Sequence, residues 1–233
     1  RYIHRLASVS GAAKILEIGA GTGRYSVALA KEGFDVTSVE LIPHNIEILK
    51  SKLGGTEKIT VFQGNAVDLS FLRDGSHDMT LLLGPMYHLY TFADQSKALS
   101  EAVRVTKPGG YILVSYCMNE ATVVDYVFRK NNLAEITENG MLTDDWHCVS
   151  QPKDIFQLFR TEDIAALDET ADVSRVKLIA ADGATNYMRE TIDSMDDQTF
   201  NKWVEYHLSV CERQDLVGAS HHTLDILIKD QEK

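Results

Sequence analysis

The sequence predicts an α/β protein built on a doubly wound, mostly parallel sheet. Strand-like and helix-like patterns alternate from residue 14 to residue 117, and a glycine-rich segment joins the first strand to the helix that follows it. Such alternation is typical of right-handed strand–helix–strand units. The chain has 233 residues, of which 44% are hydrophobic. We therefore expect a single domain over residues 1–233, with an ordinary globular core.

The glycine-rich segment is the strongest local signal. Residues 14–18 are mostly apolar and predict a short buried strand, and residues 25–31 predict a helix. Between them, Gly19, Gly21 and Gly23 alternate with other residues. Glycines at such a strand-to-helix turn bring bare backbone N–H groups close to a ligand.

The spacing of these glycines discriminates between ligands. In the dinucleotide fingerprint G-x-G-x-x-G, the third glycine position falls on Arg24 when counted from Gly19, and on Ser26 when counted from Gly21. No Gly-Lys-Ser/Thr follows, so the segment is not a phosphate-binding P-loop. Instead, Glu17 ends the strand and gives the pattern Glu-x-Gly-x-Gly-x-Gly.

That pattern resembles the first motif of class I S-adenosylmethionine (SAM) dependent methyltransferases. Residues 64–69, Gly-Asn-Ala-Val-Asp-Leu, resemble the third motif of that family, and residues 107–110, Lys-Pro-Gly-Gly, resemble its turn before the fifth strand. The resemblance covers residues 1–117. It implies a Rossmann-like sheet of seven strands whose last strand is antiparallel, SAM as the cofactor, and transfer of a methyl group.

Two acids flank the glycine turn. Glu17 suits the cationic amino-acid end of SAM, directly or through water. Glu40 ends the second strand 21 residues after Gly19, a position from which an acid accepts both ribose hydroxyls in dinucleotide enzymes. The structural alternative for Glu40 is a solvated strand end.

The family resemblance assigns the remaining cofactor contacts. It implies that the Asn65 side chain accepts a hydrogen bond from the adenine amino group and that the Ala66 N–H faces a ring nitrogen. An Asx turn at Asn65 is the structural alternative. The predicted cofactor-binding set is Glu17, Gly19, Ala20, Gly21, Tyr25, Glu40, Leu41, Asn65, Ala66 and Leu83.

The other elements of the first half follow from residue patterns. Pro43 suits the first turn of a helix that Gly54 and Gly55 end. The remaining segments are expected to be a helix tail at 1–7, strands at 36–39, 59–62, 78–83 and 111–116, a helix at 94–106 and a tight turn at 107–110.

The second half is less regular. Residues 118–172 and 183–220 are predicted to be helical insertions that form a cap over the acceptor. They include expected helices over 119–133, after Thr161, and over 187–213. Strands are expected at 173–181 and 221–229.

The segment after the fourth strand holds the candidate catalytic residues. Gly84-Pro85-Met86-Tyr87-His88 is the place where the methyl group faces the acceptor in the family that this chain resembles. Tyr87 and His88 are therefore the candidates, although Tyr87 could simply pack, and His88 could hydrogen-bond the loop or the cofactor carboxylate. Methyl transfer needs a general base only when the acceptor holds its proton tightly.

Composition narrows the classes of partner. The chain has 23 basic and 34 acidic residues, which gives a net charge of −11. A nucleic-acid partner needs a basic surface, so we expect a small-molecule acceptor instead. Three dispersed cysteines favour a reducing compartment, and no metal-ligand spacing or apolar run of membrane length is present. We therefore expect a cytoplasmic protein without a metal or membrane segment.

Two other functions remain open at this point. A nicotinamide-dependent oxidoreductase shares the fold class, but Arg24 and Glu17 count against it. A SAM-binding sensor without turnover is compatible with every cofactor motif. The sequence leaves undetermined the acceptor, the methylated atom, the oligomeric state and the residues upstream of Arg1.

Overall fold

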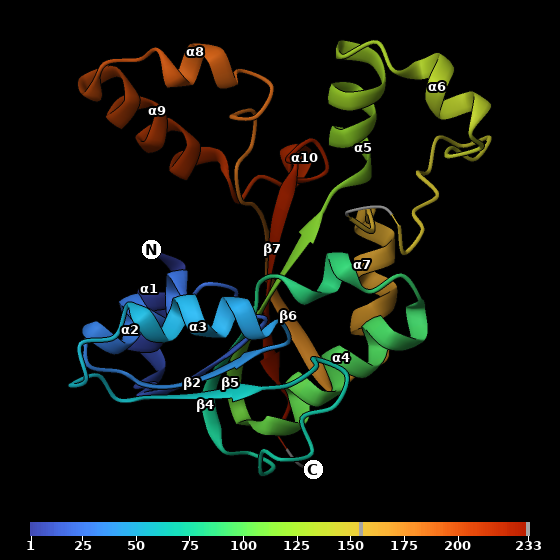
Figure 1. Ribbon diagram of the computed structural model, residues 1–233. Helices are drawn as coiled ribbons and strands as arrows, with labels where there is room; N and C mark the ends of the chain where they lie inside the picture. The colour runs from blue at the N-terminus through green and yellow to red at the C-terminus, as the bar shows by residue number, and fades with distance from the viewer. Residues whose placement is uncertain (154–155, 232–233) are drawn as a thin grey trace. The chain divides into compact units, whose positions relative to one another are not determined.

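A computed structural model describes residues 1–153 and 156–231 and contains a seven-stranded sheet in the order β3-β2-β1-β4-β5-β7-β6 (Figure 1). The pairs β1–β2, β1–β4, β2–β3 and β4–β5 are parallel. The predicted α/β fold class is confirmed. The strands are β1 (Lys14–Ile18), β2 (Asp35–Glu40), β3 (Ile59–Gln63), β4 (His77–Leu82), β5 (Thr106–Cys117), β6 (Val173–Ala180) and β7 (His222–Lys229).

Helices α2 and α3 lie on one side of the first four strands, and α4 lies on the other (Figure 1). Both faces of the central strands are therefore covered, which explains their nearly continuous burial. The helices of the first half are α1 (Tyr2–Ser10), α2 (Arg24–Lys31), α3 (Pro43–Ser51), the 3-10 helix η1 (Pro85–His88) and α4 (Phe92–Val105). Those of the second half are α5 (Asn119–Thr122), the π-helix η2 (Val123–Arg129), α6 (Leu133–Glu138), α7 (Thr161–Asp168), α8 (Arg189–Asp193), α9 (Asp197–Val210) and α10 (Gln214–Val217).

The predicted helix over 119–133 differs from the observed one. The chain begins as α5, widens into the π-helix η2, and forms α6 only after a break in which Asn131 has φ = 59°. A residue with positive φ cannot continue a right-handed helix, so this break separates η2 from α6. The π-helix places Asp125, Arg129 and Lys130 on one short stretch of chain.

The turn expected at 107–110 lies inside β5. Strand β5 already begins at Thr106, and its pairing with β4 shifts register between His77 and Met79. At Gly110, a Cβ atom would lie 2.7 Å from the carbonyl oxygen of Asp78. Residues 107–110 therefore stand opposite a single residue of β4, and Gly110 permits the close approach of Lys107 and Asp78 that this irregularity requires.

The chain divides into two compact units. Unit 1 comprises residues 1–114, 166–176 and 226–233, and unit 2 comprises residues 115–165 and 177–225. Strands β5, β6 and β7 each contain residues of both units. The two sequence stretches that form unit 2 contain most of the two predicted insertions.

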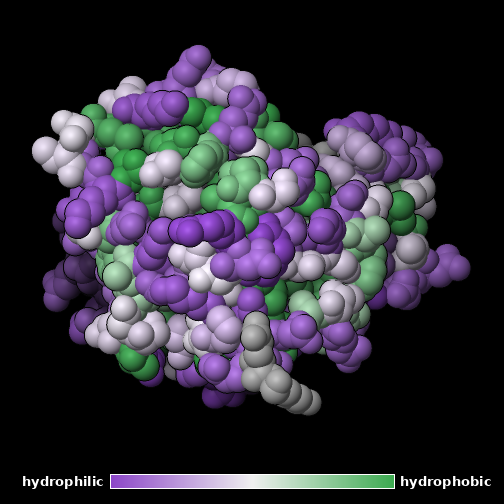
Figure 2. Space-filling model, turned by 90° about the horizontal axis from the view of Figure 1, so that it is seen from below, coloured by the Kyte–Doolittle hydropathy of each residue, from purple (hydrophilic) through white to green (hydrophobic). Residues whose placement is uncertain are grey.

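The surface carries many charged side chains. Hydrophilic residues cover much of the face shown in Figure 2, with smaller hydrophobic areas between them. Within residues 1–153 and 156–231, no helix combines the length and the apolar character that a membrane crossing requires.

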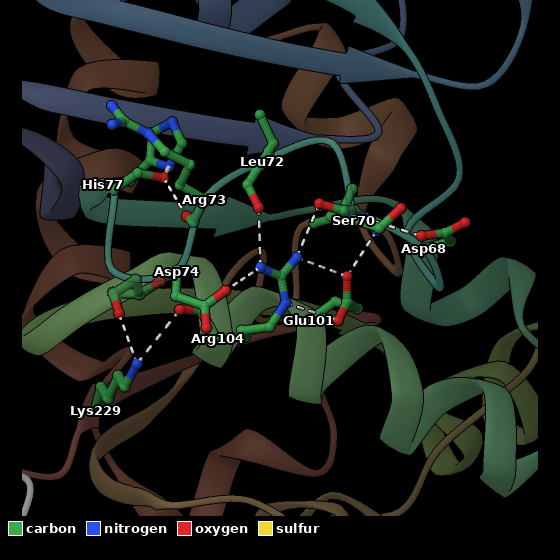
Figure 3. Close-up of polar contacts among 12 residues, drawn as sticks. Asp68, Ser70, Leu72, Arg73, Asp74, His77, Glu101, Arg104 and Lys229 are labelled. Atoms are coloured by element: carbon green, nitrogen blue, oxygen red, sulfur yellow. Dashed lines mark hydrogen bonds and ion pairs between the residues drawn. The ribbon is translucent and has the colours of Figure 1, made fainter.

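An ion-pair cluster fixes the loop between β3 and β4 (Figure 3). The Arg104 guanidinium, on α4, donates to Glu101 at 2.9 Å and to Asp74 at 2.5 Å. It also donates to the carbonyl oxygens of Leu69 and Leu72, while Glu101 accepts the Leu69 N–H at 2.7 Å. The Arg104 hydrogen bond lowers the pKa of Glu101 to about 2. One buried charge pair thus holds the loop that begins with Gly64 and Asn65.

We expect Arg104→Met to lower the free energy of unfolding by about 3 kcal/mol, because it leaves the buried Glu101 carboxylate without its main partner. The Glu101 side chain is only 7% exposed. Urea unfolding measures the change. Lys97→Met is the control, since Lys97 lies 3.5 Å from the same carboxylate but is 57% exposed.

The cluster also has a pH signature. Because the pKa of Glu101 is lowered to about 2 in the folded protein from an ordinary 4.5, its stabilisation is complete above the unfolded value and is lost as pH falls towards 2. The stability gap between wild type and Arg104→Met should therefore shrink between pH 5 and pH 2. A gap that stays constant over this range would contradict the assignment.

Candidate functional site

A cavity of about 610 Å³ lies in unit 1, where successive parallel strands end. Four segments line it, and each directly follows one of the strands β1 to β4. The carboxyl ends of parallel strands meet at one edge of a sheet, which is where open α/β sheets bind ligands. The lining residues are Gly19, Gly21, Glu40, Leu41, Ile42, Asn45, Gly64, Asn65, Ala66, Gly84, Pro85, Tyr87, His88 and Leu89.

The glycine turn borders this cavity in a backbone conformation that other residues rarely adopt. Gly19, Gly21 and Gly23 have φ values of 73°, 54° and 81°. A Cβ atom at Gly19 would lie 2.7 Å from the ring of Pro85, and one at Gly23 would lie 2.6 Å from Leu49. At Gly21, no atom lies within 4 Å of the same position. Packing therefore requires the outer two glycines, while the middle one leaves space beside the cavity.

Glu40 connects the tip of β2 to this turn. Its carboxylate accepts the Gly21 N–H at 2.7 Å, the Ile42 N–H at 2.9 Å and the Asn45 side-chain amide at 3.2 Å. The residue is only 5% exposed, yet it lines the cavity. An ionised carboxylate has about four lone-pair sites, so about one remains, on the oxygen that accepts the Gly21 N–H, for a ligand's hydroxyl group.

Glu17, predicted to bind the amino-acid end of SAM directly or through water, lies beneath the glycine turn and outside the lining of the cavity. It is 3% exposed, and its carboxyl group accepts the Ser26 N–H at 2.8 Å and the Ser26 hydroxyl. Ser26 in turn contacts Ser38 at 2.6 Å. The acid is therefore enclosed by protein, bonded to Ser26 of α2, and does not line the cavity. Burial raises the pKa of Glu17 to about 7.

Asn65 and Ala66, the predicted adenine contacts, both line the cavity. The Asn65 side-chain oxygen accepts the Val67 N–H at 3.3 Å, which is the geometry of an Asx turn. Asn65 therefore forms the Asx turn and also lines the cavity. Ala66 is 7% exposed, so its side chain is enclosed at that wall.

Tyr87 and His88 lie together on η1 and line the same cavity. The Tyr87 hydroxyl donates to the Leu83 carbonyl oxygen at 3.0 Å, and the two aromatic rings are 5.0 Å apart. This hydrogen bond is compatible with the alternative in which Tyr87 packs against its own segment and has no catalytic role. Leu83, proposed as a cofactor residue, contributes this carbonyl and lies outside the lining.

The remaining predicted residues separate into two groups. Leu41 lines the cavity, whereas Ala20 packs with Val27 and Leu49, and Tyr25 lies on α2.

Several residues that line the cavity were not predicted from the sequence. Pro43 indicates that α3 begins close to the end of β2. Ile42 and Asn45, which flank this proline, could therefore have been predicted to line the cavity. The missed residues are Ile42, Asn45, Gly64, Gly84, Pro85 and Leu89.

Comparison with known proteins gives evidence on the family that is independent of the site geometry. Residues 16–114 match a family described as a methyltransferase domain. A demethylmenaquinone methyltransferase from Clavibacter sepedonicus is 33% identical over 109 residues, which cover 47% of this chain and 42% of that protein. The chain thus spans less than half the length of this curated relative.

Two solved structures resemble the whole chain. A SAM-dependent methyltransferase from Methanosarcina mazei has a TM-score of 0.66 at 18% identity, covering 99% of this chain and 98% of that one. The N-methyltransferase NodS from Bradyrhizobium japonicum, in complex with S-adenosyl-L-homocysteine, has a TM-score of 0.59 at 13% identity, covering 98% and 84%. The two solved structures confirm the fold class, and the match of residues 16–114 to a methyltransferase domain agrees with the resemblance that the motifs of residues 1–117 indicated.

We expect Gly19→Ala to destabilise the protein. Its Cβ atom would lie 2.7 Å from Pro85 at a φ of 73°, so both packing and backbone conformation oppose it. The expected loss is about 2–4 kcal/mol. Gly33→Ala is the control, because Gly33 also has positive φ but has open space at its Cβ position. Equal losses in the two variants would show that backbone strain alone accounts for the effect.

The buried acid predicts a pH-dependent stability difference. The folded pKa of Glu17 is about 7 against an ordinary 4.5, so the folded state is penalised as pH rises through this interval. Glu17→Gln removes that penalty. Its unfolding free energy relative to wild type should rise by about 2–3 kcal/mol between pH 5 and pH 8. Glu47→Gln, at an exposed site on α3, should show no such trend.

Proposed function

We propose that this chain, whose residues 16–114 form a methyltransferase domain, is a SAM-dependent methyltransferase that acts on a small-molecule acceptor. The observation that carries the proposal is the position of the Glu40 carboxylate. It lies at the wall of a cavity, bonded to the glycine turn, where its remaining acceptor site can bind a ribose hydroxyl. The match to methyltransferase relatives supports the same reading.

The residues around the cavity fit the parts of SAM. Glu40 would bind a ribose hydroxyl, and the backbone at Gly19 and Gly21 would lie against the ligand where no Cβ intervenes. Asn65 and Ala66 would bind the adenine. A cavity of about 610 Å³ is within the usual range of roughly 300–1,000 Å³ for small-molecule sites. Glu17 would support the site without touching SAM, because its hydrogen bond to Ser26 fixes the start of α2.

SAM supplies a methyl group on a sulfonium, which is already a good leaving group. The protein's own contribution is therefore to hold the reactants in line and to exclude water. Tyr87 and His88 are at the cavity wall, where they can orient an acceptor. His88 would remove a proton only from an acceptor that does not ionise readily. Tyr87 positions η1 through its bond to the Leu83 carbonyl.

The acceptor is proposed to be a small molecule, and the compartment to be the cytoplasm. A net charge of −11 opposes a polyanionic substrate such as DNA or RNA. The relatives named above act, by their names, on demethylmenaquinone or at a nitrogen atom, which supports small acceptors without identifying this one.

A SAM-binding sensor without turnover is the principal alternative. The cofactor cavity supports binding equally well in both cases, and the candidate catalytic pair of Tyr87 and His88 carries no distinctive signature. A nicotinamide oxidoreductase is the weaker alternative, because Arg24 occupies the third glycine position of the dinucleotide fingerprint.

Titration calorimetry with SAM, S-adenosylhomocysteine and NAD, followed by a methyl-transfer assay over a panel of small acceptors, distinguishes these functions. We expect saturable binding of the two sulfur compounds, no binding of NAD, and release of S-adenosylhomocysteine with at least one acceptor. Binding without turnover across a broad panel would favour the sensor, and NAD binding alone would overturn the proposal.

We expect Glu40→Gln to weaken SAM binding by about 1–3 kcal/mol, or roughly 5- to 150-fold in Kd, because it removes charge-assisted hydrogen bonds. Titration calorimetry measures the change, and thermal unfolding checks that the variant folds. Glu47→Gln removes an equal charge from exposed α3 and should leave the Kd unchanged. An unaltered Kd in folded Glu40→Gln would mean that Glu40 only supports the backbone.

A further inference from the structure

A second cavity, of about 480 Å³, lies entirely within unit 2. Its walls come from η2, from the chain around α8 and from the residue before β7. The cofactor motifs do not account for it, and its volume falls in the range of roughly 300–1,000 Å³ that small ligands occupy. The residues that matter for its chemistry are Asp125, Arg129, Lys130, Tyr187, Arg189 and His221.

His221 is unusual among the residues of this cavity. Both of its ring nitrogens are buried, and neither makes a hydrogen bond. Its ring lies 4.7 Å from that of Tyr187, and its Nε2 atom is 3.8 Å from an oxygen of Asp125. Burial lowers the pKa of His221. A neutral imidazole offers one acceptor and one donor, and buried polar groups of this kind are normally satisfied.

The charges around His221 favour an anionic ligand. The Asp125 side chain, 10% exposed, is bonded by the Arg129 Nε atom and by Lys130 at 3.2 Å. Since Asp125 engages only the Nε atom, the terminal nitrogens of Arg129 remain available to a ligand. Arg189 and Glu190 add one charge of each sign. The lining therefore holds three basic and two acidic side chains, and Asp193, outside the lining, lies 3.5 Å from the Nε atom of Arg189.

We propose that this cavity binds a small organic carboxylate that also carries a hydroxyl or amino group. Its carboxylate would pair with Arg129, and its O–H or N–H would donate to His221. A planar guanidinium matches a carboxylate in two parallel hydrogen bonds, and a neutral imidazole accepts from a hydroxyl or an amine.

Binding to the full chain tests the proposal without requiring turnover. The probes are 3-hydroxybenzoate, 3-aminobenzoate, glycolate and glycine, each titrated by calorimetry and by NMR of the histidine side chains. Methyl 3-hydroxybenzoate lacks the charge, and 3-methoxybenzoate lacks the donor. We expect at least one probe with both groups to bind and to shift the His221 resonances, and its matched analogues to bind at least about tenfold more weakly.

Two variants locate the binding. Arg129→Gln removes the guanidinium, and His221→Phe keeps a ring beside Tyr187 but removes both nitrogens. Each should weaken the bound probe at least about tenfold. Lys202→Gln is the matched control, because Lys202 lies on α9 outside the cavity and is 71% exposed. Unchanged SAM binding in each variant shows that the cofactor site of unit 1 is intact.

The outcomes separate this inference from the proposed function. If none of the four probes binds, or if the uncharged ester binds as tightly as its parent acid, the inference is overturned while SAM binding can still stand. Equal binding by His221→Phe and wild type also overturns it, and this variant remains informative if Arg129→Gln fails to fold. Absence of SAM binding with retained carboxylate binding would overturn the proposed function and leave this inference standing.

Discussion

The hydrogen bond from the Gly21 N–H to the Glu40 carboxylate is the constraint on which the cavity of unit 1 depends. At 2.7 Å it joins the turn after β1 to the tip of β2, two segments that are 19 residues apart. The same carboxylate also accepts the Ile42 N–H at the start of α3. Since a charged acceptor strengthens each of these bonds, one side chain fixes the backbone of two loops at the mouth of the cavity.

Two acids at strand ends therefore have different roles in this protein. Glu17 and Glu40 are almost equally buried, at 3% and 5% exposure. Helix α2 covers Glu17 and gives it Ser26 as a partner, whereas Glu40 lies at an edge where no helix intervenes. Enclosure raises the pKa of Glu17 to about 7, so part of its population is protonated at neutral pH. Neighbouring structure, and not residue type, separates a structural acid from a ligand-facing one.

The cavities of the two units are surrounded by different kinds of polar group. In unit 1, backbone N–H groups and one carboxylate surround a cavity with a glycine-rich wall. In unit 2, side-chain charges meet at Asp125, and His221 is left without a hydrogen bond. The first arrangement suits a nucleoside, whose shape must be matched closely by the backbone. The second suits a compact charged molecule, because long basic side chains adapt to it.

The sequence by itself determined the α/β class, the glycine turn, and the positions of Glu40, Asn65 and His88 at one sheet edge. It could do so because alternating strands and helices leave only one edge for the carboxyl ends of parallel strands. Only the tertiary structure decided that Glu17 turns inward, that the 107–110 segment stays in β5, and that Asp125 and His221 meet although they are 96 residues apart. Those outcomes depend on which helix packs over which face and on how distant segments pair, and no local pattern of residues encodes either.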